Sequence, residues 1–334
     1  MAGCDYFIKR KKTAMRLLLG YPVEAKHVDQ IQAAAGPYEV VVGEQDQLAE
    51  LLLQADLFCG HVKVMVDWKS IVRLGRLQWI QSSAAGLDHC LDPAVVHSEI
   101  VISSASGVLA DQVAEHTMGL IGAVLRRLPD FLEAQGRREF LRRPTRDLHG
   151  STVGIVGFGG VGRRLAELLA PYRVRIVATD YFPVDPPDHV DVVWPRKKLP
   201  QLLAESDIVV LCVPLTDETR GLIDKNNFQA MKPESVLVNV CRGSVVVEHD
   251  LVAALLTGQI SAAAIDVTRD EPLPAQSPLW EAPNLLITPH VAGQAANRID
   301  RMTHFFCENL TRYQQGRPLV NLVDKQLGFP RPAR

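Results

Sequence analysis

A glycine-rich segment between an apolar strand and a helix constrains the fold of this chain most strongly. Residues 157–162 read GFGGVG, which matches the pattern G-x-G-x-x-G, and they follow directly on the apolar run TVGIV. The helical pattern VGRRLAELL begins within the same segment. A strand, a tight turn and a helix N-terminus in this order are typical of the loop that holds a dinucleotide pyrophosphate. The segment therefore predicts a Rossmann-type parallel sheet.

Each glycine of this loop has a separate expected role. Gly157 permits the tight turn, Gly159 lets the backbone approach the pyrophosphate, and Gly162 allows close helix–strand packing. The next strand, VRIVATD, ends at Asp180, 23 positions after Gly157 (180 − 157). A carboxylate there would accept hydrogen bonds from ribose hydroxyls and repel a 2′-phosphate, so NAD is favoured over NADP. A flavin or S-adenosylmethionine site can use a similar loop and stays open at this point.

Short apolar runs alternate with helical patterns on both sides of this loop. Strands are expected before it at 16–21, 39–43, 57–62, 78–83 and 100–104. Strands are expected from it onward at 152–156, 174–179, 208–213, 236–239, 262–266 and 285–288. Runs such as IVVLCV and VLVNV are almost entirely apolar, as strands covered by helices on both faces require. The pattern predicts an α/β fold with two doubly wound parallel-sheet domains.

Composition narrows the class of protein and its location. The chain has 334 residues, which is the size of about two domains, and a net charge of −2. That charge creates no field favouring nucleic acid or an anionic membrane, and no apolar run is long enough to span a bilayer. The six cysteines form no CxxC pair and no zinc-ligand spacing, so we expect no metal site and a cytoplasmic protein. The polar start, Met1 to Arg16, is interpreted as a disordered leader.

Three polar residues follow three predicted strands of the second domain. Arg242 follows VLVNV, Glu271 lies five residues after Asp266, and His290 follows LLIT and Pro289. Ligands of open α/β sheets bind at the carboxyl ends of the strands. An Arg holds a carboxylate well, and a Glu beside a His would raise the imidazole pKa so that the His can protonate a carbonyl oxygen. Each residue alone could be structural, but together they favour hydride exchange with a keto acid.

Five motifs make the chain resemble the D-isomer-specific 2-hydroxyacid dehydrogenase family. They are TVGIVGFGGVGRRLAELL, VPLTDETRGLID (213–224), VNVCRGSVVVEHDL (238–251), AIDVTRDEPLP (264–274) and ITPHVAG (287–293). The resemblance extends from about Arg16 to the end, whereas residues 1–15 match nothing. It implies a Rossmann cofactor domain (116–299) inserted in a flavodoxin-like substrate domain (1–115 and 300–334).

The resemblance also implies an activity and a set of site residues. The activity is NAD(H)-dependent reduction of a small 2-keto acid to the D-2-hydroxy acid, or the reverse, by a homodimer joined through its cofactor domains. The implied catalytic residues are Arg242, Glu271 and His290. Cofactor contacts are implied at Gly160, Val161, Asp180, Val213, Pro214, Val240 and Asp266, with Asp266 holding the nicotinamide carboxamide. Within the loop SAAGLD (83–88), backbone N–H groups at Ala84, Ala85 and Gly86 would bind the substrate carboxylate together with Arg242.

Two departures and one alternative qualify this resemblance. A Trp often precedes the cofactor domain, but this chain has RREFLRRPTRD, and Thr268 replaces the aromatic residue that usually follows Asp-Val. Dimer contacts and pocket shape therefore stay open. Glyoxylate and hydroxypyruvate are the expected substrates; formate oxidation and a phosphoglycerate dehydrogenase with a C-terminal regulatory domain are disfavoured. The alternative is an NAD-sensing, co-repressor-like binding protein of the same fold, disfavoured by the short leader and tail.

Overall fold

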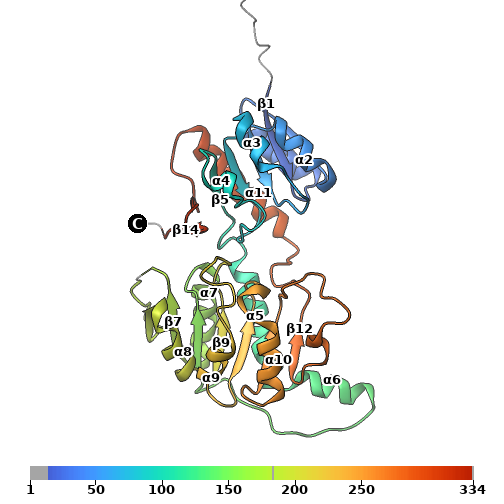
Figure 1. The fold of residues 1–334 in the computed structure, drawn as a ribbon, viewed down its shortest axis with the longest axis vertical. Helices are drawn as coiled ribbons and strands as arrows, with labels where there is room; N and C mark the ends of the chain where they lie inside the picture. The colour runs from blue at the N-terminus through green and yellow to red at the C-terminus, as the bar shows by residue number, and fades with distance from the viewer. Residues whose placement is uncertain (1–13, 183, 333–334) are drawn as a thin grey trace, which may run out of the picture. The chain divides into compact units, whose positions relative to one another are not determined.

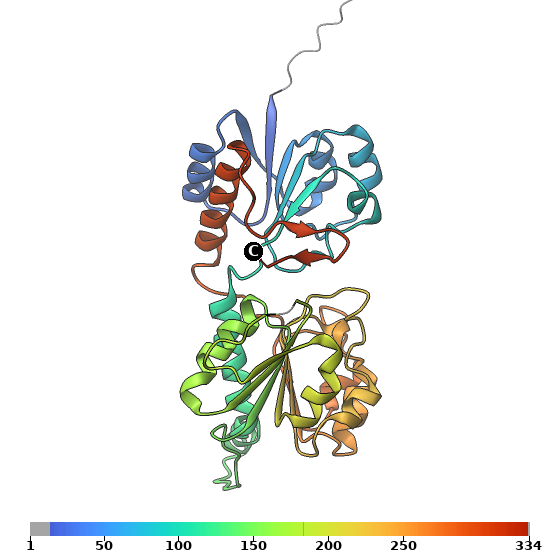
Figure 2. The same ribbon diagram turned by 90° about the vertical axis from the view of Figure 1, so that its left-hand side faces the viewer.

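The computed structural model describes residues 14–182 and 184–332. The predicted leader therefore lies, up to residue 13, outside the described residues. The chain divides into two compact units, which are described separately (Figures 1 and 2). Of the described residues, unit 1 comprises 14–105 and 299–331, and unit 2 is built on Ser106–Arg298.

Unit 1 is a parallel α/β sheet. Its five strands run in the order β2-β1-β3-β4-β5. They are β1 (Met15–Gly20), β2 (Tyr38–Val42), β3 (Leu57–Gly60), β4 (Trp79–Ser82) and β5 (Val101–Ser103). The helices are α1 (Ala25–Ala34), α2 (Leu48–Leu51), α3 (Trp68–Leu74), α4 (Pro93–Val96) and α11 (Arg298–Gln314), and a short hairpin joins β13 (Val323–Asp324) to β14 (Phe329–Pro330).

Alternation along β1 explains how helices cover both faces of this sheet. Leu18 packs in a cluster with Leu48, Ile71 and Ile80, which come from α2, α3 and β4. Leu17, Leu18 and Leu19 are all buried, so apolar side chains leave β1 in both directions. Figure 2 shows the blue and red helices of unit 1 on one side of its sheet and the cyan and teal ones on the other.

Unit 2 is a larger parallel sheet of seven strands in the order β12-β11-β10-β9-β6-β7-β8. The strands are β6 (Thr152–Val156), β7 (Arg175–Asp180), β8 (Val192–Pro195), β9 (Ile208–Leu211), β10 (Val236–Asn239), β11 (Ala262–Ile265) and β12 (Leu285–Ile287). The helices are α5 (Ala110–Leu125), α6 (Leu128–Gly136), α7 (Gly160–Leu169), α8 (Leu199–Glu205), α9 (Lys225–Ala230) and α10 (Glu248–Leu256). All its strand pairs are parallel.

The strand order indicates where a ligand would bind to unit 2. From β6 the chain adds β7 and β8 on one side, then crosses to add β9 to β12 on the other. The order therefore reverses between β6 and β9, and ligands of open α/β sheets bind at the carboxyl ends of strands at such a point. Two apolar clusters, one including Val209 and Leu237 and the other Ile155 and Val210, cover the two faces. The predicted α/β class with two doubly wound parallel sheets is confirmed.

Sequence patterns missed several short elements. Helix α6 follows two arginines that read as a helix end, and Arg127 does interrupt the helix there with a left-handed φ of 54°. Strand β8 was missed because it is short, lies at the sheet edge and is only partly buried. The boundary predicted between residues 115 and 116 falls inside α5, whereas the compact units divide between Ala105 and Ser106. No helix among the described residues is both long and apolar enough to cross a bilayer.

Candidate active site

The glycine loop of unit 2 is shaped by close backbone contacts. Gly157 has a φ of +98°, and an added Cβ would lie 2.8 Å from the carbonyl carbon of Cys212. A Cβ at Gly160 would lie 2.8 Å from Cα of Gly107, and one at Gly162 would lie 2.2 Å from the oxygen of Gly157. At Gly159, by contrast, an added Cβ would meet no atom of the described residues within 4 Å. Gly159 therefore leaves open space at the N-terminus of α7, where N–H groups and the helix dipole favour an anion.

Asp180 has a second task besides the predicted one at the ribose. Its Oδ2 accepts a hydrogen bond from the N–H of Phe158 (2.7 Å), and its Oδ1 accepts one from Phe182 (2.9 Å). The carboxylate at the end of β7 is thus hydrogen-bonded to the glycine loop that follows β6, and it stabilises the conformation of that loop. Each oxygen keeps capacity for a further hydrogen bond. The other predicted cofactor residues, Val161, Val213, Pro214 and Val240, are half-buried.

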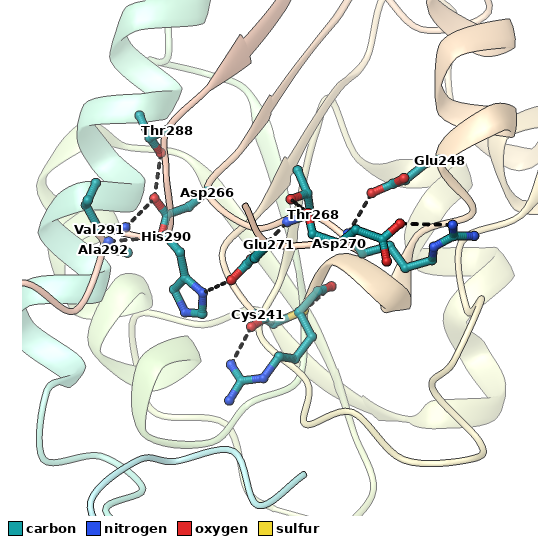
Figure 3. A network of polar contacts seen from close by, with 12 residues as sticks. Cys241, Glu248, Asp266, Thr268, Asp270, Glu271, Thr288, His290, Val291 and Ala292 are labelled. Atoms are coloured by element: carbon teal, nitrogen blue, oxygen red, sulfur yellow. Dashed lines mark hydrogen bonds and ion pairs between the residues drawn. The ribbon is translucent and has the colours of Figure 1, made fainter. Parts of the chain in front are cut away.

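Glu271 and His290 are brought together by two neighbouring strands, β11 and β12. Oε2 of Glu271 lies 2.7 Å from Nδ1 of His290, and its Oε1 accepts a hydrogen bond from the N–H of Thr268 (3.1 Å). Figure 3 shows the carboxylate and the imidazole ring facing each other. An ionised carboxylate only accepts hydrogen bonds, so Nδ1 carries the proton and Nε2 is left for exchange with a ligand. Both side chains are partly open to solvent, at 38% for Glu271 and 46% for His290.

The backbone of His290 is held in a rare conformation. Its φ is 53°, in the left-handed region that costs a non-glycine residue about 1–2 kcal/mol. Asp266 stabilises this turn, because its carbonyl accepts from the N–H of His290 (2.7 Å) and its carboxylate accepts from Val291 and Ala292 (2.9 Å each). Thr288 adds a hydroxyl donor to Oδ1 at 2.6 Å (Figure 3). The turn is thus fixed from one buried carboxylate.

The same carboxylate retains one unused hydrogen-bond acceptor position. Asp266 is 1% exposed, and three hydrogen bonds reach its oxygens, two at Oδ1 and one at Oδ2. A carboxylate offers about four acceptor positions, so one remains at Oδ2. An amide N–H of a bound cofactor fits that remaining position chemically.

Arg242 leaves β10, the strand next to β11. Its Nη1 donates to the carbonyl of Cys241 (2.7 Å). A Cβ at the following Gly243 would lie 1.9 Å from the carbonyl carbon of Thr268, so the Arg242 turn packs directly on the loop that leads to Glu271. Burial raises the pKa of the neighbouring Cys241 thiol to about 11, which keeps it protonated and unreactive near neutral pH.

The predicted carboxylate-binding loop follows β4 in unit 1. The N–H of Ala84 donates to Oγ of Ser82 (3.1 Å), so this donor is already used. The N–H groups of Ala85 and Gly86 make no hydrogen bond within the described part of the chain. Two of the three predicted donors are therefore open to a ligand.

Other polar residues near the predicted site residues were missed by the sequence analysis. A ring nitrogen of His89 lies 2.8 Å from Oγ of Ser82, and the His89 ring lies against that of His61, tilted by 42° with ring centroids 4.1 Å apart. Thr288, two residues before His290, and His116 on α5 were also missed, although Thr288 lies inside the ITPHVAG motif. Among residues 14–182 and 184–332, no group of three or more His, Cys, Asp or Glu side chains could hold a metal ion.

Known proteins resemble the chain over most of its length. A family model described as "D-isomer specific 2-hydroxyacid dehydrogenase, NAD binding domain" matches residues 118–292. A glyoxylate reductase of Thermofilum pendens is 36% identical over 267 residues, 77% of this chain and 77% of that protein. The human glyoxylate reductase/hydroxypyruvate reductase is 33% identical over 249 residues, 73% of this chain and 76% of that protein.

A solved structure extends the match to the whole fold. The D-isomer-specific 2-hydroxyacid dehydrogenase of Xanthobacter autotrophicus, solved with NADPH and MES, has a TM-score of 0.79 and 26% identity. It covers 95% of this chain and 100% of that one. The family model and these relatives, together with the glycine loop and the Glu271–His290 pair, show that the chain belongs to the D-isomer-specific 2-hydroxyacid dehydrogenase family and is an oxidoreductase.

Proposed function

We propose that this protein reduces glyoxylate, hydroxypyruvate or a similarly small 2-keto acid to the D-2-hydroxy acid, or catalyses the reverse reaction, with a nicotinamide dinucleotide. The observation that carries the proposal is the 2.7 Å contact between Glu271 and His290 at the ends of adjacent strands in the sheet that bears the glycine loop. The names of the Thermofilum and human relatives support this substrate class.

The proposed mechanism assigns one task to each polar residue. Arg242 holds the substrate carboxylate with its guanidinium. Nicotinamide, when bound, supplies the hydride. As hydride reaches the carbonyl carbon, Nε2 of His290 gives its proton to the carbonyl oxygen. Glu271 keeps the ring oriented through Nδ1 and balances the charge of the imidazolium.

The proposed cofactor is NAD, with a modest preference over NADP. Asp180 disfavours a 2′-phosphate, but basic residues lie close to it. Asp180 is paired with Pro195 across β7 and β8, and Arg196, Lys197 and Lys198 follow at once. The guanidinium of Arg196 lies 4.9 Å from the ring centroid of Tyr181, next to Asp180. These cations would partly offset the repulsion of a 2′-phosphate, and the Xanthobacter relative was solved with NADPH.

One activity panel tests the proposal. Purified protein is given short 2-keto acids with NADH and with NADPH, and cofactor oxidation is followed at 340 nm. Turnover of glyoxylate or hydroxypyruvate is the expected result. Binding of NADH without turnover of any keto acid would favour the NAD-sensing alternative, whereas the Glu271–His290 contact and the names of the Thermofilum and human relatives favour catalysis.

We also propose that the protein is a cytoplasmic homodimer joined through unit 2. Helix α6 stands apart from the sheet of unit 2 in Figure 1 and carries Leu132 with 67% exposure, and Phe140 beyond it is 90% exposed. A pocket of about 300 Å³ opens beside the end of α5, lined by Met118, Gly122, Leu125, Leu148 and Tyr172 among others. Exposed apolar side chains and an apolar pocket on one unit suit reciprocal contact with a second copy.

The dimer proposal is tested by sedimentation velocity. Leu132→Asp and Phe140→Asp are expected to shift the protein from dimer to monomer. Met65→Asp is the control, because Met65 is 93% exposed but lies in unit 1. A wild-type monomer, or equal effects of all three substitutions, would contradict the proposal.

A further inference from the structure

A histidine on α5 reaches the turn that holds His290, and neither the motifs nor the proposed mechanism uses it. Nε2 of His116 lies 3.1 Å from Oγ1 of Thr288 and 3.4 Å from Oδ1 of Asp266. The His116 side chain is 24% exposed, and that of Asp266 is 1% exposed. All three residues belong to unit 2. The imidazole of His116, on helix α5, thus lies beside the same buried carboxylate that holds the turn after His290.

The hydrogen bonds along these residues run in one direction. The backbone N–H of Val291 donates to Oδ1 of Asp266 and that of Ala292 to Oδ2, so both carboxyl oxygens act as acceptors. Thr288 has one hydroxyl hydrogen, and the 2.6 Å contact to Asp266 takes it. The oxygen of Thr288 must therefore accept from Nε2–H of His116. The order of donation is His116 to Thr288 to Asp266.

We propose that His116 is a positioning residue that acts through Thr288 on Asp266. Its N–H fixes the rotamer of the Thr288 hydroxyl, and that hydroxyl fixes the plane of the carboxylate. The carboxylate in turn holds the N–H groups of Val291 and Ala292, and it holds the remaining acceptor position at Oδ2 toward a cofactor amide. The catalytic consequence rests on the proposed function, whereas the effect on the 290–292 turn does not.

Matched substitutions separate this role from simple packing. His116→Leu removes the donor and keeps most of the volume, and His116→Gln restores an N–H donor. Thr288→Val removes the hydroxyl from a nearly unchanged shape, and Thr288→Ser restores it. We expect His116→Leu and Thr288→Val each to lower kcat with a 2-keto acid by about tenfold and to raise the KM for NADH, since hydrogen bonds to charged groups have this order of effect.

Two comparisons carry the test. Because the two residues act in series, the double variant should be no worse than the poorer single variant, instead of showing the product of the two losses. His116→Gln and Thr288→Ser should recover to within about threefold of wild type. Additive losses without recovery, accompanied by equal falls in Tm for all variants, would overturn the proposal in favour of packing.

Hydrogen exchange supplies a readout that does not depend on activity. Exchange at the amides of Val291 and Ala292 should be faster in His116→Leu and Thr288→Val and unchanged in the Gln and Ser variants. If wild type has no keto acid activity but this exchange pattern holds, the proposed function fails and the positioning role stands. If exchange at these amides is the same in all five proteins, the positioning role is wrong even when the enzyme is active.

Discussion

Replacing Glu271 by Gln tests the acid–base pair without changing its shape. Both oxygens of Glu271 accept N–H groups, one from Nδ1 of His290 at 2.7 Å and one from Thr268 at 3.1 Å. A Gln amide has one acceptor and one NH₂ group, so it can satisfy only one of these two donors. In one orientation, the NH₂ group of the Gln faces the N–H of Thr268. In the other, it faces Nδ1 of His290, which must then lose its proton.

The expected size of the effect follows from the lost hydrogen bond. A hydrogen bond to a charged group contributes roughly 1.5–3 kcal/mol, which corresponds to a change in rate of about tenfold to a hundredfold. The pair is partly exposed, at 38% and 46%, so the lower part of this range applies. We therefore expect Glu271→Gln to lower kcat for glyoxylate by about ten- to thirtyfold.

The assay is steady-state oxidation of saturating NADH across a range of glyoxylate concentrations. Asp270→Asn is the matched control, because Asp270 neighbours Glu271 but pairs with the exposed Arg269. The control should retain wild-type kcat within about twofold, since exposed ion pairs contribute little. A Glu271→Gln enzyme that matches this control would refute the role given to the carboxylate.

Three further substitutions test the structural account around the site. Gly243→Ala should lower the free energy of unfolding by about 3 kcal/mol or more in urea titrations, because its Cβ would lie 1.9 Å from the backbone of Thr268. The control is Gly119→Ala, which should be neutral or slightly stabilising because an added Cβ there would meet no described atom within 4 Å. Equal effects of the two substitutions would contradict this packing. Asp180→Ala should raise kcat/KM for NADPH relative to NADH and also loosen the glycine loop; an unchanged cofactor ratio would mean that another group reads the ribose. Arg242→Lys should raise the KM for the keto acid by at least about tenfold, since a Lys cannot make the bidentate contact; an unchanged KM would remove Arg242 from substrate binding.

The strands were predictable because burial on both faces leaves a plain signal. Runs such as Ile208–Leu211 and Val236–Asn239 are completely buried, so their apolar composition marked them in the sequence. Edge strand β8 is only partly buried and carries no such signal, and α6 was missed because Arg126 caps the end of α5 and the next residue, Arg127, caps the start of α6. Apolar sequence patterns identify a helix or strand by the surface that it buries, so partly exposed elements are not detected.

The positions of strand ends correctly predicted the contact between Glu271 and His290, but the local hydrogen bonds around it were not predictable from the sequence. The rule that ligands meet the carboxyl ends of strands brought together Glu271 and His290 from different strands. It did not predict that the N–H of Ala84 donates to Ser82, or that Asp266 stabilises the left-handed backbone conformation of His290. These facts depend on side-chain rotamers and backbone angles, which spacing along a chain does not specify.

The central claim is that His290 delivers the proton in a keto acid reduction, and one comparison of wild type with His290→Ala tests it most directly. The rate of NADH oxidation with glyoxylate is measured beside the NADH dissociation constant from fluorescence titration. We predict that His290→Ala lowers kcat by about 10²-fold or more while the dissociation constant changes by less than about threefold. A variant that turns over near the wild-type rate would contradict the account.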